Sequence, residues 1–379
     1  MRRTLESQQG VAMIMALGAI VIIGVLMGSV LFVSTQDYRV GGNTMRMERA
    51  ATAAELGLNR VPLDWNLADN LGLSTGNTRT RTYTAPGGGS ANVVITRLPG
   101  PFFWAVSEGS SGGIGSQASG RRRYGLLFRL DMPQMNFLGA ITTQGNTTVN
   151  GNVTVSGNDT TPGGWSSCGP TGPAVAGAAI SPTTTATVNG SVTLKGNPTV
   201  LTTPAASDSN TYFNYGNSNY QSLAATANLT YPGGTLLNGV GPIVVGAVCQ
   251  TSLNPPNWGE PNHATPAGAC DSYFPVIHVL GDLKVTTGRG QGILLVDGDL
   301  TVAGNFAFDG AVIVRGGLKM SGTGNKIVGA TMAASVSVDD NVALSGNTSL
   351  LYSACALQSA LSASAYPTRA IQRAWVDLY

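Results

Sequence analysis

Three aspartates lie near one another in the sequence and are the residues best suited to chemistry. Asp297, Asp299 and Asp309 could supply the acid and base of polysaccharide cleavage. Such a pair needs two different environments, which separate the pKa values of the two carboxyl groups. Here each aspartate instead precedes or follows a glycine, and asparagine occupies the same slots elsewhere: Asn152, Asn158 and Asn305. This pattern favours a structural role in turns, and we expect no enzymatic activity.

The sequence offers few ligands for a cofactor. His263 and His278 stand apart and no two cysteines are close in sequence, which argues against a zinc site. Calcium is the ion that the aspartate-rich corners, or the adjacent Asp339 and Asp340, could bind. We otherwise expect no cofactor.

The aspartates belong to a glycine repeat that predicts their surroundings. Glycines recur every six residues from Gly298 to Gly322, and apolar side chains follow two and four positions after the first four of them: Gly298, Gly304, Gly310 and Gly316. Alternate residues of a strand share a face, so each repeat supplies two inward-facing apolar groups between sharp corners. Such short strands bury a core only when they are stacked. We predict a parallel β-helix over residues 136–360, similar to bactofilin-like repeats and right-handed because the spacing is not uniform. A meander of hairpins is the alternative.

A segment rich in Asn, Pro, Tyr and Gly interrupts this repeat at 202–273 and is predicted to be a long loop insertion. Inserted loops often carry the binding function of a repeat protein. Tyrosine and tryptophan rings with asparagine amides suit sugars and protein partners, but they suit packing against the β-helix equally well. The C-terminal tail, 361–379, has an amphipathic run from Thr368 that we expect to pack on the β-helix.

Four cysteines allow three disulfide pairings. Cys249 with Cys270 would close the insertion, and Cys168 with Cys355 would tie the two ends of the repeat region. We expect structural disulfides, because the preceding sequence places this region outside the cytosol.

One long helix is predicted near the start of the chain. The uncharged stretch from Val11 to Val33 would rise about 35 Å as a helix, which is enough to cross a membrane core of about 30 Å. A small basic excess before it favours a cytoplasmic N-terminus. The helical pattern continues to residue 61, with one apolar face: Met47, Ala50, Ala51, Ala54, Leu58 and Val61.

A small antiparallel sheet is predicted to follow, over residues 78–135. Its strand-like runs are Ala91–Leu98, Phe102–Gly109 and Arg121–Leu130. The last run begins with the basic cluster Arg121, Arg122 and Arg123, which suits either solvent or contact with lipid headgroups or an acidic partner.

The N-terminal residues resemble those of PilX-type minor pilins of type IV pilus systems. The resemblance covers about the first 60 residues: a leader ending in Gly10, the apolar span from Val11, and STQDYRVGGNTMRMERAATAAELGLNRV. It implies that a prepilin peptidase removes residues 1–10, cleaving between Gly10 and Val11, and methylates the new N-terminus. It also implies that residues 11–61 pack against other pilin helices in a filament, through a set that we take as Met15, Met47, Ala50, Ala54 and Leu58.

One departure bears on the position in such a filament. Most pilins carry glutamate as the fifth residue of the mature chain, whereas this sequence has Met15 there. PilX-like proteins often lack this glutamate, which suits a subunit at the filament tip and argues against incorporation along the shaft.

The expected class is α+β, with a transmembrane helix, a small sheet and a β-helix. The resemblance implies a minor pilin that primes or caps a pilus or pseudopilus, anchored in the inner membrane with its head in the periplasm or outside the cell. A tip adhesin or surface glycan would be a partner of the head. Nucleic acid would not, because the net charge is only +2. A membrane-anchored scaffold that enters no filament, and a carbohydrate-active β-helix enzyme, are the alternatives.

Overall fold

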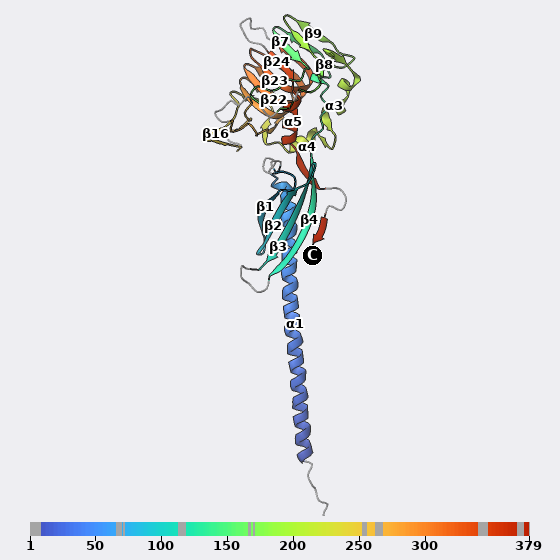
Figure 1. Ribbon diagram of the computed structural model, residues 1–379, viewed down its shortest axis with the longest axis vertical. Coiled ribbons are helices and arrows are strands. Elements are labelled where there is room, and N and C mark those ends of the chain that lie inside the picture. The colour runs from blue at the N-terminus through green and yellow to red at the C-terminus, as the bar shows by residue number, and fades with distance from the viewer. Residues whose placement is uncertain are drawn as a thin grey trace, which may run out of the picture. The chain divides into compact units, whose positions relative to one another are not determined.

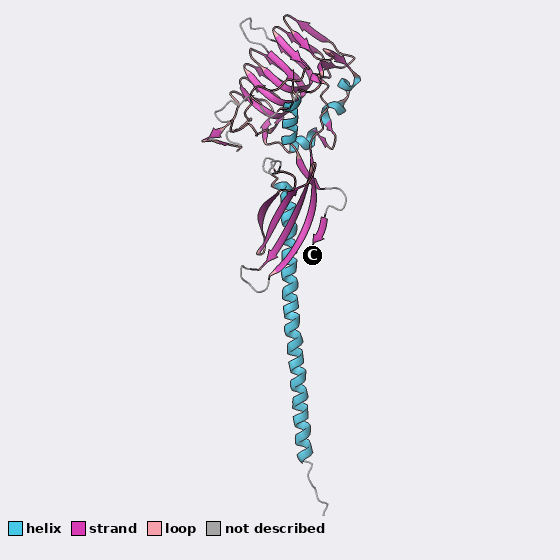
Figure 2. Ribbon diagram, in the orientation of Figure 1, coloured by secondary structure: helices cyan, strands magenta, loops and turns pink. Residues whose placement is uncertain are grey.

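The computed structural model describes residues 9–65, 70, 73–112, 119–165, 168–169, 171–251, 256–261, 268–339, 348–369 and 375–378. The chain divides into two compact units (Figure 1). The first, here the helix–sheet unit, comprises 1–65, 72–129 and 368–379. The second, the parallel-sheet unit, comprises 66–71 and 130–367. One long helix dominates the first unit and strands dominate the second (Figure 2).

A single helix, α1 (Gln9–Leu63), begins the helix–sheet unit and continues through Gly41 and Gly42. Its two halves have different surroundings. Large apolar side chains of the first half, from Met13 to Val40, are all exposed in the described chain. In the second half one face is fully buried: Ala50, Ala53, Ala54, Leu58 and Val61. The predicted apolar face is therefore confirmed at four of its six residues, since Met47 is exposed and Ala51 is only partly buried, and it packs on the chain's own sheet.

That sheet is antiparallel, with strand order β1-β2-β3-β4-β25 and β26 paired to β4. Its strands are β1 (Thr78–Ala85), β2 (Gly89–Arg97), β3 (Phe102–Ser111), β4 (Gly120–Asp131), β25 (Tyr366–Arg369) and β26 (Trp375–Leu378). The prediction that the C-terminal tail packs on the β-helix is wrong. Trp375 lies opposite Leu126 in an antiparallel pair, because the free edge of β4 offers unpaired backbone groups.

Small residues let α1 approach the sheet closely. Gly109 lies near the end of β3, where an added Cβ would overlap the carbonyl oxygen of Ala50 and the amide nitrogen of Ala54. Gly57 of the helix is similarly close to Ala91 and Ser107 of the sheet. The helix and the sheet therefore meet almost backbone to backbone.

The second unit is built on one large parallel sheet. The α+β prediction is therefore confirmed in three parts: a long apolar helix, an antiparallel sheet on which it packs, and a large parallel sheet that follows. The strands of this sheet are β5 (Gly139–Thr143), β6 (Thr147–Asn150), β7 (Val153–Ser156), β8 (Ala176–Ile180), β9 (Ala186–Asn189), β10 (Thr193–Lys195), β11 (Val200–Thr202), β14 (Leu229–Pro232), β15 (Thr235–Leu237), β18 (Val276–Leu280), β19 (Leu283–Val285), β20 (Gly288–Val296), β21 (Leu300–Ala303), β22 (Phe306–Ser321), β23 (Lys326–Asp339) and β24 (Thr348–Tyr352).

The parallel pairs fall into three ladders, which the chain visits in turn. The first ladder runs β14-β18-β20-β22-β23-β5-β8-β11. The second runs β15-β19-β21-β22-β23-β6-β9. The third runs β20-β22-β23-β24-β7-β10. The longest strands, β22 and β23, contribute to all three ladders because they bend from one to the next.

The order of the ladders is not the order of the sequence. Ile141 of β5 pairs with Thr331 of β23, so the chain enters the stack in its middle and winds toward β11. Residues 203–228, here called the return segment, then lead to β14 at the opposite end. From there the chain winds back until β23 and β24 meet β5, β6 and β7. The predicted insertion at 202–273 is therefore not one loop, since it contains β14 and β15 of the sheet.

Two hydrophobic cores hold this unit together. The first lies inside the three ladders and contains the predicted inward-facing side chains of the glycine repeat: Leu300, Val302, Phe306, Phe308, Val312, Val314, Leu318 and Met320. The second lies on the outer side of the first ladder. There the return segment, with α3 (Ser209–Phe213) and α4 (Tyr220–Ala225), and α5 (Ala354–Ala363) cover apolar residues such as Ile293 and Ile313.

Candidate functional site

The first half of α1 exposes a long row of large apolar side chains, which a membrane or other apolar helices would have to cover. Within the described residues, α1 is a helix long and apolar enough to cross a membrane, and none of its most apolar part is buried. Met15 is 70% exposed there. Gly10 and Val11 lie at the start of α1, but their side chains are outside the described ones.

Hydroxyl groups in this half bond to the helix itself. The Ser29 hydroxyl donates to the Leu26 carbonyl oxygen at 2.8 Å, and the Thr35 hydroxyl donates to that of Phe32 at 2.7 Å. These polar atoms therefore do not resist transfer of the helix into an apolar environment.

The residues predicted to pack in a filament divide into two groups. Ala50, Ala54 and Leu58 are fully buried against β2 and β3 of their own unit, so they are not available to a neighbouring helix. This corrects the prediction, and the reason is that the amphipathic half of α1 serves as the core of its own unit. Met15 and Met47 remain exposed, at 70% and 48%.

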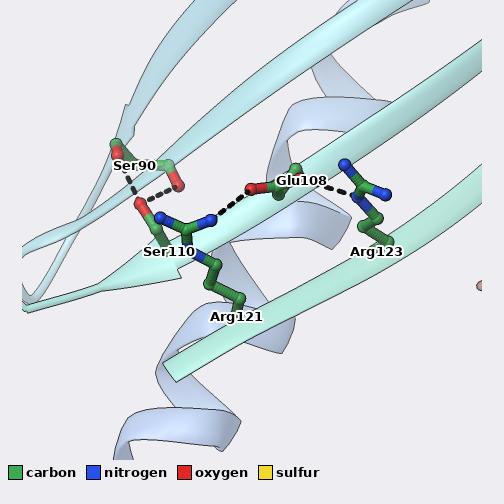
Figure 3. Close-up of polar contacts among 5 residues, drawn as sticks. All are labelled: Ser90, Glu108, Ser110, Arg121 and Arg123. Carbon is green, nitrogen blue, oxygen red and sulfur yellow. Dashed lines mark hydrogen bonds and ion pairs between the residues drawn. The ribbon is translucent and has the colours of Figure 1, made fainter. Parts of the chain in front are cut away.

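The basic cluster at the start of β4 is paired with acidic side chains (Figure 3). Glu108 accepts from Arg123 Nε at 2.6 Å and lies 3.6 Å from Arg121 Nη1. Arg122 Nη1 lies 3.9 Å from a carboxylate oxygen of Asp377 in β26. Exposed pairs of this kind contribute at most about 1 kcal/mol each. The geometry favours a solvated surface network over a dedicated site for lipid headgroups.

The three aspartates do not form one site. Asp299 is exposed at a corner, where its Oδ1 accepts from the Gly317 backbone N–H at 2.8 Å. Asp282 accepts in the same way from the Asp299 N–H, so aspartates link the turns that connect neighbouring parallel strands. Asp309 is instead buried, and burial raises the pKa of its carboxyl group to about 7. Among the described residues, no three or more His, Cys, Asp or Glu side chains gather as metal ligands. The side chains of Asp339 and Asp340 lie outside the described ones.

Asp297 has a role that sequence reasoning missed. Its Oδ1 accepts from the Tyr220 hydroxyl at 2.9 Å and lies 3.7 Å from Arg315 Nη1, while its Oδ2 lies 3.1 Å from His278 Nε2. The Arg315 guanidinium also lies over the rings of Tyr220 and Phe213. This cluster fastens the return segment to the parallel sheet.

The tyrosines of the return segment are core residues. Tyr212, Tyr215 and Tyr220 are at most 5% exposed, and burial raises the pKa of each phenol. The Tyr212 hydroxyl donates to the Ala206 carbonyl oxygen, and the Tyr215 hydroxyl donates to that of Tyr212. These rings pack on the sheet and are not presented to a sugar.

Both disulfides have the predicted partners, Cys168–Cys355 and Cys249–Cys270. The first does not tie opposite ends of the repeat region in space. It joins the segments after β7 and β24, which are neighbours in the third ladder. A cavity of about 410 Å³ lies beside it, lined chiefly by hydroxyl and amide side chains of α5 and the facing loop, including Thr171, Gln358 and Ser362.

Comparison with known proteins adds little to this picture. No family model matches the sequence, and no curated protein matches it. A similar solved structure is the competence-associated pilin ComZ from Thermus thermophilus, at 11% identity and a TM-score of 0.22, over 88% of this chain and 97% of that chain. A TM-score of this size carries no argument, so the function proposed below rests on this chain's own residues.

Proposed function

We propose that the chain is a minor pilin-like subunit of a type IV pilus or related pseudopilus, which primes or caps the filament and displays a β-helix head. The observation that carries the proposal is the division of α1. One continuous helix is exposed and apolar from Met13 to Val40 and is buried by its own sheet from Ala50 to Val61.

This division suits a helix that passes from lipid into a bundle of like helices. A helix that is apolar all round must be surrounded by lipid or by other apolar helices. A simple anchor needs no more than the membrane span. Here the same helix continues into the helix–sheet unit and packs on its sheet. If several such helices packed together through their exposed halves, they would set the distance between the helix–sheet units of neighbouring subunits. The leader that ends at Gly10 and the span from Val11 fit this pathway.

Met15 favours a place at the filament tip. The side chain at this position is exposed and has no charge with which to pair the N-terminal amine of a neighbour. A subunit with no neighbour above it needs no such pair. The proposed partners are therefore other pilin subunits through residues 12–40, the prepilin peptidase and the inner membrane, with the N-terminus cytoplasmic before processing.

The head is proposed to be a non-catalytic β-helix. Support comes from the three parallel ladders, which the chain visits in a constant order with apolar side chains inside. The aspartates that an enzyme would use have other roles here. Asp299 accepts a hydrogen bond at a turn, Asp297 accepts one from the return segment, and Asp309 is buried. A tip adhesin or a surface glycan is the proposed class of partner for the head.

The experiment is the mass of the N-terminus of membrane-extracted protein, with and without an active prepilin peptidase. We expect a chain that starts at methylated Val11 only when the peptidase is active. Gly10→Val should block cleavage, whereas the control Gly18→Ala, at an open position inside the helix, should be processed normally. A chain that keeps residues 1–10 in both cells would instead favour the anchored scaffold.

Position and chemistry need two further tests. Immunogold labelling of sheared pili should place the subunit at filament ends, and loss of the chain should lower the number of pili. Polysaccharide turnover that disappears in Asp297→Asn and Asp299→Asn would support the enzyme alternative in place of this proposal.

A further inference from the structure

One end of the parallel sheet is open on all three sides. The last strands of the three ladders at this end are β11, β9 and β10, and each pairs on only one side among the described residues. Figure 1 shows β8 and β9 at this end of the stack. The outer edges of these strands therefore present unpaired backbone N–H and C=O groups, which is the usual template for association of β-structure.

The apolar interior of the sheet is exposed at the same end. Val149 of β6 belongs to the core, and Val188 of β9 is paired in register with it, so the two side chains lie on the same face of the sheet. Val149 is 3% exposed, whereas Val188 is 44% exposed. Leu194 of β10 is likewise only partly buried, although its neighbour Val155 is 1% exposed. The terminal coil thus lacks the cover that every inner coil receives from the next one.

The lengths of the open edges decide what could cover them. They span Ala186–Asn189, Thr193–Lys195 and Val200–Thr202, with turns between them. An extended peptide could pair with one of these short edges but not with all three. A coil of the same three-sided form would pair with all three and would also cover the apolar interior. The contact between β23–β24 and β5–β7 shows that three-sided pairing of this kind occurs within this chain, there between parallel strands, whereas the strands of two like ends would pair antiparallel.

We propose that this end is a dimer interface, at which the equivalent end of a second copy docks. The opposite end of the stack is less suited, because its third side is occupied. There Gly241 pairs with Asn257, and the Trp258 ring covers the core against Phe306 and Phe308. Like ends meet about a two-fold axis, which gives a closed dimer in place of an open fibre.

Charge repulsion would not oppose contact between two such ends, because this region has almost no charged residues. Lys195 is the only charged residue from Thr160 to Ser207, so two copies bring almost no like charge together. The inference does not depend on entry into a filament, since it concerns the parallel-sheet unit alone.

The test is the mass of the detergent-solubilised full chain by light scattering over a range of concentrations. We expect a dimer whose dissociation constant rises at least tenfold in Val188→Lys, because each copy would then bring a second positive charge, beside Lys195, to the contact and would lose an apolar side chain there. Val245→Lys is the matched control, since Val245 is also an exposed strand valine, in the hairpin of β16 (Val244–Val245) and β17 (Val248–Cys249). Equal unfolding midpoints of the two variants would show that both are folded.

Association through α1 is distinguishable from this contact. A dimer held by the apolar helix would be insensitive to Val188→Lys, and that result would overturn the proposal. A mixture of isotopically labelled and unlabelled wild-type chains, treated with an amine cross-linker, should give Lys195–Lys195 links between copies. A monomer at all concentrations would also overturn the proposal. The partner that covers the open end of the sheet would then be a different protein.

Discussion

Cys168 and Cys355 are joined by a disulfide although 187 residues separate them, because the chain enters and leaves the parallel stack at the same level. Other contacts reinforce this junction. The Asp159 carboxylate accepts from the Ala354 N–H at 2.8 Å, and the Thr160 N–H donates to the Tyr352 carbonyl oxygen at 2.9 Å. The disulfide thus joins two positions of the unit that are 187 residues apart in the sequence.

The first prediction concerns the two disulfides. Replacing Cys168 and Cys355 by serine should lower the free energy of unfolding by about 5 kcal/mol in the chain-entropy model, because a very long loop is released. Serine at Cys249 and Cys270, which are 21 residues apart, should cost only about 3 kcal/mol. Urea unfolding followed by tryptophan fluorescence measures both. A larger loss for the shorter loop would show that the junction is held by its non-covalent contacts.

The glycine repeat predicts which side chains face inward but not which coils are neighbours. The repeats present similar pairs of apolar residues between turns, so pairing of Ile141 with Thr331 is as compatible with the repeat as pairing in sequence order. The disulfide partners could be predicted because four cysteines leave few choices. The buried role of Tyr215 could not, because its segment is rich in Ser and Asn, and the local bond of its hydroxyl is visible only in the structure.

The second prediction concerns the pH dependence of stability. Burial raises the pKa of Asp309 from 3.8 to about 7, so the folded state holds this proton more tightly than the unfolded state. The resulting stabilisation is fully present below about pH 4 and is lost as the pH rises to about 7. Its size is on the order of 4 kcal/mol, from about 1.4 kcal/mol per pKa unit. The stability of Asp309→Asn relative to wild type should therefore increase between pH 4 and 7.

Denaturant unfolding at several pH values measures this difference. Asp299→Asn is the control, because Asp299 is exposed and an asparagine oxygen can still accept from the Gly317 N–H. It reports how an aspartate-to-asparagine change affects unfolding at a site where the carboxyl group is not buried. If the difference in the free energy of unfolding between Asp309→Asn and wild type did not change with pH, burial would not raise the pKa of the Asp309 carboxyl group.

The third prediction concerns the fastening of the return segment. Tyr220→Phe removes the donor to Asp297 and should destabilise the parallel-sheet unit by about 1 kcal/mol. Tyr220→Ala also removes a buried ring that lies under Arg315, and it should cost about 3–5 kcal/mol. Hydrogen exchange should rise in residues 209–226 in both variants. Tyr366→Phe in β25 is the matched control. If exchange in residues 209–226 rose equally in this control variant, the Tyr220–Asp297 hydrogen bond would not be what holds the return segment on the sheet.

The fourth prediction concerns the contact between α1 and its sheet. Gly109→Ala places a Cβ against the carbonyl oxygen of Ala50 and the backbone of Ala54, and neither backbone can move without lifting the helix. We expect a loss of about 1–3 kcal/mol or more, in the range for overpacked cores, and faster proteolysis between residues 44 and 63. Gly42→Ala is the control, because nothing lies near that position and alanine favours a helix by about 1 kcal/mol. If Gly109→Ala resists protease as well as Gly42→Ala does, then α1 is not held against β3 as closely as the structure indicates. The sheet would then be free to separate from the helix, and the proposal that packed helices set the distance between helix–sheet units would lose its basis.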